Sequence, residues 1–395
     1  MTIPLADRMA RLGTESAFEV LARAQAMEAA GTRVIHLEIG EPDFPTAGHI
    51  IEAATGALRG GHTHYVPAPG IPALRVAVTE FLERAGRLRG ISPDRVVVTP
   101  GAKPVMFFTI LALCGPGDEV LCPDPGFPMY ESITSFAGAT AIPVPLRERN
   151  QFRVDTAELE SLVTDRTRLL IINSPHNPCG SALTRQDCEA IADIALRHNL
   201  MVLSDEVYWA IRYGEQPHAS VLDVDGMADR TILLDGWSKT FAMTGWRLGF
   251  GVFPPALVEP VTRLVVNSVS CTSAFSQHAA LAALQGPWQP VEQMVAEFRR
   301  RRDVIVAGLN DIPGVSCVEP QGAFYAFCNI TGTGLTSARL QERLLSEAGV
   351  AALAGTAFGS AGEGFLRFSY ANSVENIRAA LDAVRACLAG ATAPG

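Results

Sequence analysis

Short apolar runs alternate with segments of helical periodicity along most of this chain. The runs that read as strands cover residues 95–99, 119–122, 168–173, 201–205, 231–235 and 248–253. Apolar positions recur at helical spacing between them, over residues 103–114, 185–198 and 256–267. This alternation is typical of a largely parallel sheet with helices on both faces. We therefore predict one large α/β domain over residues 46–285.

The two ends of the chain have a different pattern. A helical stretch over residues 15–30 precedes the large domain, and strand signals at 323–329 and 365–370 follow it. We predict that residues 1–45 and 286–395 pack together as a smaller α+β domain. The helical stretch 291–309 contains the basic run Arg299 to Arg302, which we interpret as a solvated helix face.

Charge and composition narrow the classes of partner. The chain has 395 residues, with 32 Lys+Arg against 41 Asp+Glu and a net charge of −9. This acidic balance opposes binding to nucleic acid or to anionic membranes. No apolar run approaches the ~18 residues of a membrane span, so we expect a cytoplasmic protein. The eight cysteines form no C-x-x-C pair, which favours reduced and mostly buried thiols.

Several common catalytic patterns are missing. The sequence has no G-x-G-x-x-G after a strand, no Walker A loop, no closed nucleophile elbow and no H-E-x-x-H helix. We therefore expect no metal centre.

Polar residues cluster directly after the predicted strands, where open α/β sheets bind ligands. Gly101, Ala102 and Lys103 follow one strand through a Pro-Gly turn into a helix, whose free N–H groups suit a phosphate. Asn177 lies in a loop fixed by two prolines and a glycine. Asp205 ends another strand, three residues before Tyr208. A carboxylate at a buried strand end needs a cation or a strong donor, or it caps a helix.

The segment 234–249 carries the strongest candidate chemistry. Lys239 lies among aromatic and small residues, and loss of water there lowers the pKa of an amine and makes it nucleophilic. Arg247, eight residues later, supplies a permanent cation for a phosphate. Together with Asp205 these residues fit pyridoxal phosphate, whose aldehyde, ring nitrogen and phosphate need a lysine, a carboxylate and an arginine.

Five runs then establish a family resemblance. Residues 39–44, 173–180, 204–208, 238–249 and 367–371 resemble, in order, the motifs of class I aminotransferases in the aspartate aminotransferase superfamily of fold-type I pyridoxal phosphate enzymes. The resemblance covers nearly the whole chain. It implies a large, mixed but mostly parallel sheet flanked by helices, with a smaller α+β domain made from both termini.

The resemblance also implies roles for individual residues. Lys239 would form the internal aldimine and then shuttle a proton, Asp205 would pair with the ring nitrogen, and Tyr208 and Asn177 would bind the phenolic oxygen. Phe127 would stack on the ring. The residues implied at the phosphate end are Arg247, Ser238, Gly101, Ala102 and Lys103. Arg367 would bind the substrate α-carboxylate, with Gly40 and Asn177 beside it. Tyr65 would reach the phosphate of the neighbouring subunit, which implies a homodimer.

Three positions depart from the family pattern. Phe127 stands where many members have tryptophan, Gly236 where some have a phosphate-binding serine, and Cys179 where threonine or glycine is usual. We expect the loss of an indole donor at the first position and of one phosphate contact at the second. The third change is expected to be structural.

The substrate side chain is less defined. Segment 265–270 lacks the arginine of dicarboxylate-specific members, while Lys103 either meets a distal carboxylate, as in bacterial relatives, or is a solvated helix residue. Phe18 either favours apolar donors at the pocket mouth or, as we prefer, packs in the core. We predict a ping-pong aminotransferase with 2-oxoglutarate or pyruvate as acceptor. Its donor stays open among aspartate, aromatic and aliphatic amino acids. A C–S β-lyase on the same fold is the alternative reaction, and a non-catalytic sensor module is disfavoured.

Overall fold

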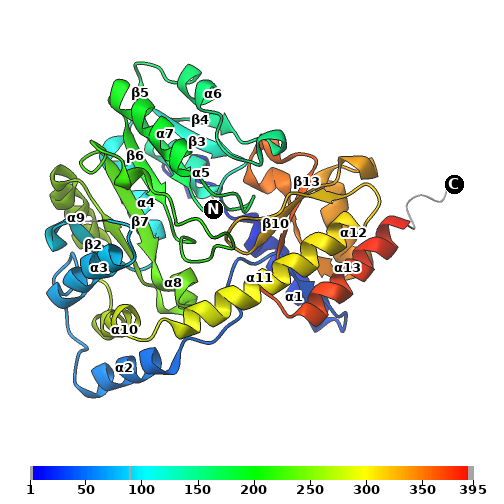
Figure 1. The fold of residues 1–395 in the computed structure, drawn as a ribbon, viewed down its shortest axis with the longest axis horizontal. Coiled ribbons are helices and arrows are strands. Elements are labelled where there is room, and N and C mark those ends of the chain that lie inside the picture. Colours follow the sequence, from blue (N-terminus) through cyan, green and yellow to red (C-terminus); the bar gives the residue numbers. More distant parts are fainter. Residues whose placement is uncertain (1–2, 89, 390–395) are drawn as a thin grey trace.

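The computed structural model describes residues 3–88 and 90–389, and its centre is a seven-stranded sheet (Figure 1). The strand order is β2-β8-β7-β6-β5-β3-β4. The bounds are β2 Val96–Thr99, β3 Glu119–Asp124, β4 Thr140–Pro145, β5 Thr167–Asn173, β6 Met201–Asp205, β7 Thr231–Gly236 and β8 Gly249–Val252. All neighbours pair in parallel except β8, which is antiparallel to β2 and β7. The predicted mixed but mostly parallel sheet is confirmed.

Helices bury both faces of this sheet. Along β2, Val97 belongs to one apolar cluster while Val96 and Val98 belong to another, and β7 alternates in the same way. Successive side chains of a strand point to opposite faces, so both faces are packed. The covering helices are α2 Gly48–Arg59, α3 Pro72–Arg84, α4 Lys103–Leu113, α5 Met129–Ala137, α6 Thr156–Ser161, α7 Arg185–Arg197, α9 Pro255–Val269 and α10 Ala274–Gln285.

The strand β4 is absent from the sequence prediction. It contains Pro143 and Pro145 and lies at the edge of the sheet, where it pairs only with β3. A proline has no N–H to donate, which is tolerated at an edge and hides the strand signal.

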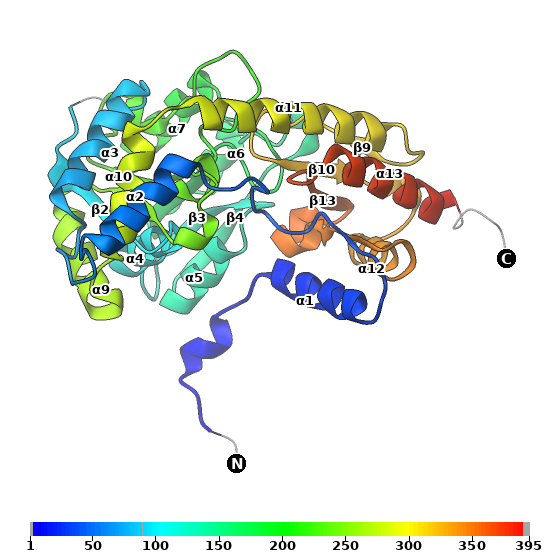
Figure 2. The same cartoon turned by 90° about the horizontal axis from the view of Figure 1, so that it is seen from below.

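A smaller unit lies beside the large sheet. Its four-stranded antiparallel sheet has the order β12 (Leu353–Ala354), β13 (Phe365–Ser369), β10 (Tyr325–Asn329) and β9 (Ser316–Cys317). The helices α11 (Gln289–Asn310), α12 (Ser337–Ala348) and α13 (Val374–Ala389) pack with it. The N-terminal segment joins this unit, because β1 (Ile35–His36) pairs in parallel with β11 (Val350–Ala351) and α1 (Ser16–Ala29) contacts β11 and β12. Figure 2 shows α1 beside α12. The boundaries at 45/46 and 285/286 stay a prediction.

The basic run on α11 is only partly a solvated face. Arg299 and Arg300 are exposed, as predicted, but Arg301 and Arg302 are buried. Arg301 pairs with Asp43 at 2.6 Å, and Arg302 pairs with Glu319 at 3.0 Å. The prediction was wrong for these two residues because α11 runs along the large and the small unit and is covered on one side (Figure 1).

All eight cysteines are free thiols, and six of them are buried. The prediction that most of the thiols are buried is confirmed. Within residues 3–88 and 90–389, no helix is both long and apolar enough to span a membrane.

Candidate active site

A cavity of about 520 Å³ lies where the carboxyl ends of β5, β6 and β7 face the small sheet. Its volume is typical of a site for a cofactor together with a small substrate. Eleven of the residues predicted for the site line it: Gly40, Ala102, Lys103, Phe127, Asn177, Asp205, Tyr208, Ser238, Lys239, Arg247 and Arg367. Residues more than 300 positions apart in the sequence therefore meet in one place.

Lys239 lines this cavity and lies on the one-turn helix α8 (Trp237–Thr240). Its Nζ donates to the carbonyl oxygen of Gly40 at 2.5 Å. Burial lowers the pKa of this amine to about 8. About a tenth of the amine is therefore unprotonated at pH 7, far more than for an ordinary lysine, and is available as a nucleophile or base. The whole sequence contains only two lysines, Lys103 and Lys239, and both line the cavity.

Asp205 ends β6 and is buried. The hydroxyl of Tyr130 donates to its Oδ2 at 2.7 Å, and the N–H of Val207 donates to Oδ1 at 3.3 Å. Burial raises the pKa of Asp205 to about 6. Such a carboxylate gains from a cationic partner in the cavity, because the partner offsets the cost of the buried charge.

The loop after β5 is organised around Asn173. Its Nδ2 donates to the carbonyl oxygen of Asp205 at 2.9 Å, and its Oδ1 accepts the N–H of Asn177 at 2.8 Å. Asn177 is thereby fixed in the cavity wall, with its Oδ1 accepting from Arg367 Nη1 at 3.0 Å.

The opposite wall is formed by residues of the small sheet. Arg367 on β13 is buried, and its guanidinium lies 4.4 Å from the centroid of the Tyr325 ring. Its Nη2 donates to the carbonyl oxygen of Glu38, whereas its Nε is buried with no partner. The Tyr325 hydroxyl contacts that of Tyr208 at 2.7 Å. A buried guanidinium with donors to spare is suited to binding a carboxylate as a fork.

Arg247 and the Pro-Gly turn form a third part of the site. Gly101 does not line the cavity itself, but a Cβ there would meet Arg247 Nη2 at 2.2 Å and its φ is +92°. Only glycine therefore lets the guanidinium lie against this turn. Arg247 is exposed, and its Nη1 donates to Thr244 O at 2.7 Å. Ser238 and Ala102 border the same end of the cavity.

The cavity mouth brings Lys103 to the N-terminal helix. Lys103 forms an ion pair with Glu15, and its Nζ lies 5.5 Å from the centroid of Phe127. Phe18 lines the cavity and is 58% exposed. The preferred interpretation of Phe18 as a core residue is wrong, because α1 turns this side of the helix toward the cavity.

Tyr65 is the predicted residue that the protomer does not bring to the site. Its side chain is 87% exposed, and it does not line the cavity. Sequence reasoning missed four other contributors: Tyr130, Asn173, Tyr325 and Glu15. Asn173 could have been found, because it ends an apolar strand. The other three come from elements that only the tertiary fold brings together.

The residues present fit the three reactive parts of pyridoxal phosphate. Lys239 offers an amine of lowered pKa, Asp205 a carboxylate without a cationic partner, and Arg247 a cation over an open glycine turn. Arg367 remains for a substrate carboxylate, because its Nε has no partner.

Comparisons with known proteins identify the family of the chain. The family model described as aminotransferase class I and II matches residues 32–384. The aspartate aminotransferase of Musicola paradisiaca is 39% identical over 96% of this chain and 95% of its own. The aromatic-amino-acid aminotransferase 2 of Thermococcus litoralis is 42% identical over 96% of both chains. The structure of the Thermus thermophilus aspartate aminotransferase with maleate has a TM-score of 0.93 at 35% identity, covering 98% of this chain and 100% of that one.

Proposed function

Because the chain belongs to the aminotransferase class I and II family and is a pyridoxal-phosphate-dependent aminotransferase, we propose that Lys239 is its catalytic lysine. The observation that carries this proposal is that the Lys239 amine lines one cavity together with a buried carboxylate, Asp205, and a buried guanidinium, Arg367. When bound, the cofactor supplies an aldehyde and an electron-withdrawing ring that acidifies the α-carbon of an amino acid. In this role the Lys239 amine takes a proton at Nζ and returns it.

The other site residues bind and orient the cofactor and the substrate. Asp205 is proposed to bind the protonated ring nitrogen of the cofactor, while the Tyr130 hydroxyl holds that carboxylate and Asn173 holds the backbone carbonyl of Asp205. Asn177 and Tyr208 bind the phenolic oxygen. Phe127 would stack on the ring of the cofactor, and its phosphate would be held by Gly101, Ala102, Lys103, Ser238 and Arg247. Arg367 binds the substrate α-carboxylate, next to Gly40.

We propose that the donor is aspartate or an aromatic amino acid and that the acceptor is 2-oxoglutarate or pyruvate. Lys103 offers a cation at the mouth, which suits a distal carboxylate once Glu15 is displaced. Phe18 offers an apolar surface at the same mouth, which suits an aromatic side chain. Relatives named for both substrate classes support this pair of donors.

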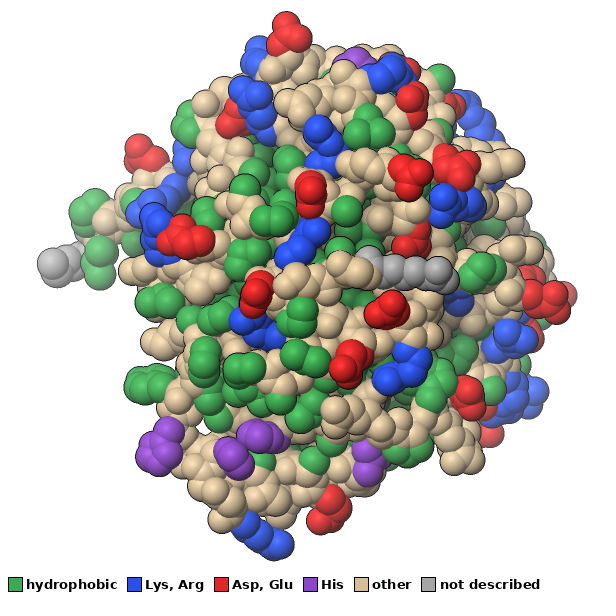
Figure 3. All heavy atoms as spheres, turned by 60° about the vertical axis from the view of Figure 1, so that its left-hand side comes forward, with side chains coloured by type: hydrophobic (Ala, Val, Ile, Leu, Met, Phe, Trp, Pro, Cys, Tyr) green, Lys and Arg blue, Asp and Glu red, His purple; other side chains and the backbone are tan. Residues whose placement is uncertain are grey.

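We also propose that the enzyme is a cytoplasmic homodimer with shared sites. Tyr65 is exposed and does not line its own cavity, and further exposed apolar side chains lie on α2 and α9, namely Ile51, Leu58, Val266 and Val269. Figure 3 shows hydrophobic side chains gathered on this end of the molecule, close to several histidines. An exposed apolar face of this kind favours contact with a second copy. Sedimentation velocity tests the dimer, and loss of cofactor affinity in Tyr65→Ala tests the shared site.

A half-reaction tests the reaction type. The visible absorbance of the purified holoenzyme is recorded while amino acids are added singly, without an acceptor. Conversion of the band, and its restoration by a 2-oxo acid, identify a transaminase and name its donor. Release of ammonia without restoration identifies the C–S β-lyase alternative. A folded Lys239→Ala variant that keeps full turnover refutes the assignment of Lys239.

A further inference from the structure

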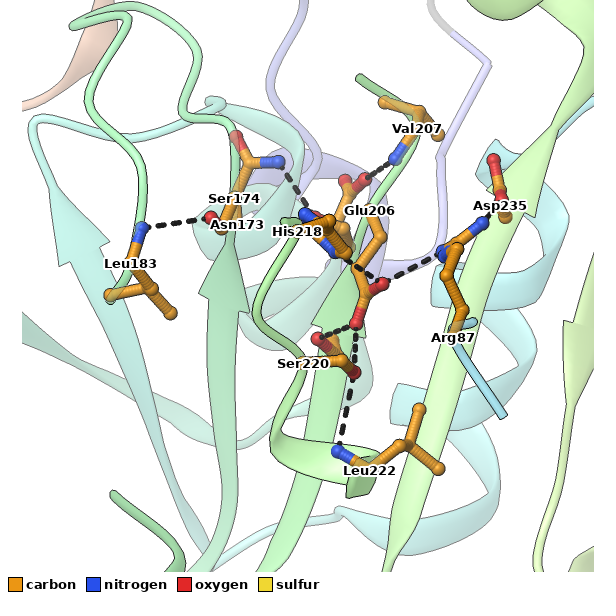
Figure 4. Close-up of polar contacts among 12 residues, drawn as sticks. Arg87, Asn173, Ser174, Leu183, Glu206, Val207, His218, Ser220, Leu222 and Asp235 are labelled. Atoms are coloured by element: carbon orange, nitrogen blue, oxygen red, sulfur yellow. Dashed lines mark hydrogen bonds and ion pairs between the residues drawn. The ribbon is translucent and has the colours of Figure 1, made fainter. Parts of the chain in front are cut away.

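Behind the active site, an arginine that the proposed reaction does not use is buried among carboxylates. Arg87 follows α3 and is 2% exposed. Its Nη2 lies 2.7 Å from Glu206 Oε2, and its Nη1 lies 2.5 Å from Asp235 Oδ2 (Figure 4). The guanidinium also lies 4.4 Å from the centroid of the Trp209 ring. Burying a cation is costly unless it is paired, so the buried Arg87 guanidinium depends on its two carboxylate partners.

The two carboxylates are neighbours of the proposed catalytic residues. Glu206 directly follows Asp205 at the end of β6, and Asp235 lies on β7, four residues before Lys239. The two strands are adjacent and parallel, and the N–H of Glu206 donates to the carbonyl oxygen of Leu234 at 2.9 Å. One guanidinium therefore connects the strand ends that carry the Asp205 carboxylate and the Lys239 amine.

Two serine hydroxyls and a histidine complete the cluster around Glu206. Its Oε1 accepts from the hydroxyls of Ser204 at 2.9 Å and Ser220 at 2.6 Å, and its Oε2 lies 2.7 Å from His218 Nε2. Burial lowers the pKa of His218, which leaves Arg87 as the permanent positive charge of the cluster. Although burial opposes it, His218 and Arg87 hold the pKa of Glu206 well below its usual range.

We propose that Arg87 is a positioning residue for the cofactor site. By binding Glu206 and Asp235 together it fixes the two strand ends, and its charge compensates the carboxylates next to Asp205. This role rests on the proposed contact between Asp205 and the ring nitrogen of the cofactor.

The electrostatic effect of Arg87 on the ionisation of Asp205 has a direction that can be measured. The groups that contact Asp205 or act on its charge are the Tyr130 hydroxyl from α5, the N–H of Val207, the Tyr208 hydroxyl, and the carboxylates of Glu206 and Asp235. Removing Arg87 adds uncompensated negative charge to this set, which makes Asp205 harder to ionise. Removing the Asp235 carboxylate takes negative charge away and makes Asp205 easier to ionise.

The affinity for pyridoxal phosphate, followed by fluorescence quenching across pH, tests the proposal without any turnover. Affinity falls at acid pH as Asp205 is protonated, and we call this part of the pH profile the acid limb. The Asp205→Asn variant should have no acid limb, which assigns the limb to Asp205. We expect Arg87→Gln to move the limb to higher pH by roughly half a unit or more. Asp235→Asn moves it to lower pH, and Arg87→Gln/Asp235→Asn returns it close to the wild-type position.

A purely structural role of Arg87 gives a different pattern. It predicts weaker binding in both single variants, no opposite displacement of the acid limb and no recovery in the double variant, and this pattern overturns the proposal. Arg185→Gln, which removes an exposed ion pair with Glu189 at 2.7 Å, is the matched control and leaves the limb unmoved.

If Arg87→Gln does not fold, Asp235→Asn and Arg87→Lys decide. Arg87→Lys keeps the limb in place, and a limb that Asp235→Asn leaves unmoved is a refutation. Loss of turnover in Lys239→Ala, with an unmoved limb in the Arg87 variants, shows that the inference fails while the proposed function stands.

Discussion

In the cofactor-free protein, the ionised Asp205 carboxylate lowers the free energy of unfolding, and replacing it with an amide would remove this penalty. Burial raises the pKa of its carboxyl from the ordinary 3.8 to about 6. The folded chain therefore binds this proton more tightly than the unfolded chain. The penalty is absent below pH 4, grows between pH 4 and 6 and is complete above pH 6. A rise of about 2.2 in pKa corresponds to about 3 kcal/mol at pH 8, at 1.36 kcal/mol for each pH unit.

Asp205→Asn removes this penalty at a small loss. An amide still accepts from the Tyr130 hydroxyl, but it loses the bond from the N–H of Val207, which at 3.3 Å contributes about 1 kcal/mol. We therefore expect the cofactor-free variant to be about 2 kcal/mol more stable than the wild type at pH 8. Near pH 4 the variant loses this advantage.

Urea unfolding of both cofactor-free proteins at equal concentration, at pH 4, 6 and 8, measures the difference. Glu206→Gln is the matched control, because it makes the same chemical change one residue away. The pKa of Glu206 is held well below its usual range, so its carboxylate stabilises the fold above pH 5 and the amide costs stability at pH 8. A difference between Asp205→Asn and wild type that is constant across pH refutes the reasoning. With the cofactor added, the order reverses, because binding stabilises the wild type more.

Three further substitutions test other parts of the site. Gly40→Ala places a Cβ 2.1 Å from the Tyr325 hydroxyl, so we expect kcat/KM to fall at least about tenfold in steady-state assays, and unchanged kinetics would contradict this close approach. Arg367→Lys replaces a fork with a point charge, and we expect the KM for the amino acid to rise roughly 100-fold in the half-reaction while the cofactor stays bound. Glu15→Gln frees Lys103 from its ion pair, and we expect kcat/KM to increase a few-fold for aspartate but not for phenylalanine; equal changes for both would exclude a distal-carboxylate role.

Most strands of the large sheet followed from local signals, and the eleven predicted residues of the cavity lining followed from such signals together with the family resemblance. The apolar run that ends in Asp205 and the one that leads into the turn at Gly101 identify both the sheet and its ligand edge. What failed depends on contacts between distant segments. The burial of Arg301 requires Asp43, which lies 258 positions earlier, and the exposure of Phe18 depends on where α1 packs.

Tyr130, in the site itself, also could not be predicted from the sequence, because its role depends on a contact with a distant segment. Its helical position is compatible with any core role, and only the fold shows that its hydroxyl meets Asp205. The strand β4 was missed for a local reason. Its two prolines cannot donate backbone hydrogen bonds, so the sequence does not have the pattern of a strand.

Confinement of the lysines to one cavity has a practical consequence. Outside that cavity the cationic side chains of the chain are guanidinium groups, together with histidine when it is protonated. Guanidinium groups do not react with aldehydes or activated esters as amines do. Borohydride reduction of the cofactor-loaded enzyme should therefore fix close to one label per chain, with Lys103 the only competing side-chain amine. A Lys103→Arg chain would carry a single lysine, so an amine-directed reagent would label only the proposed catalytic lysine and the α-amino group of the chain.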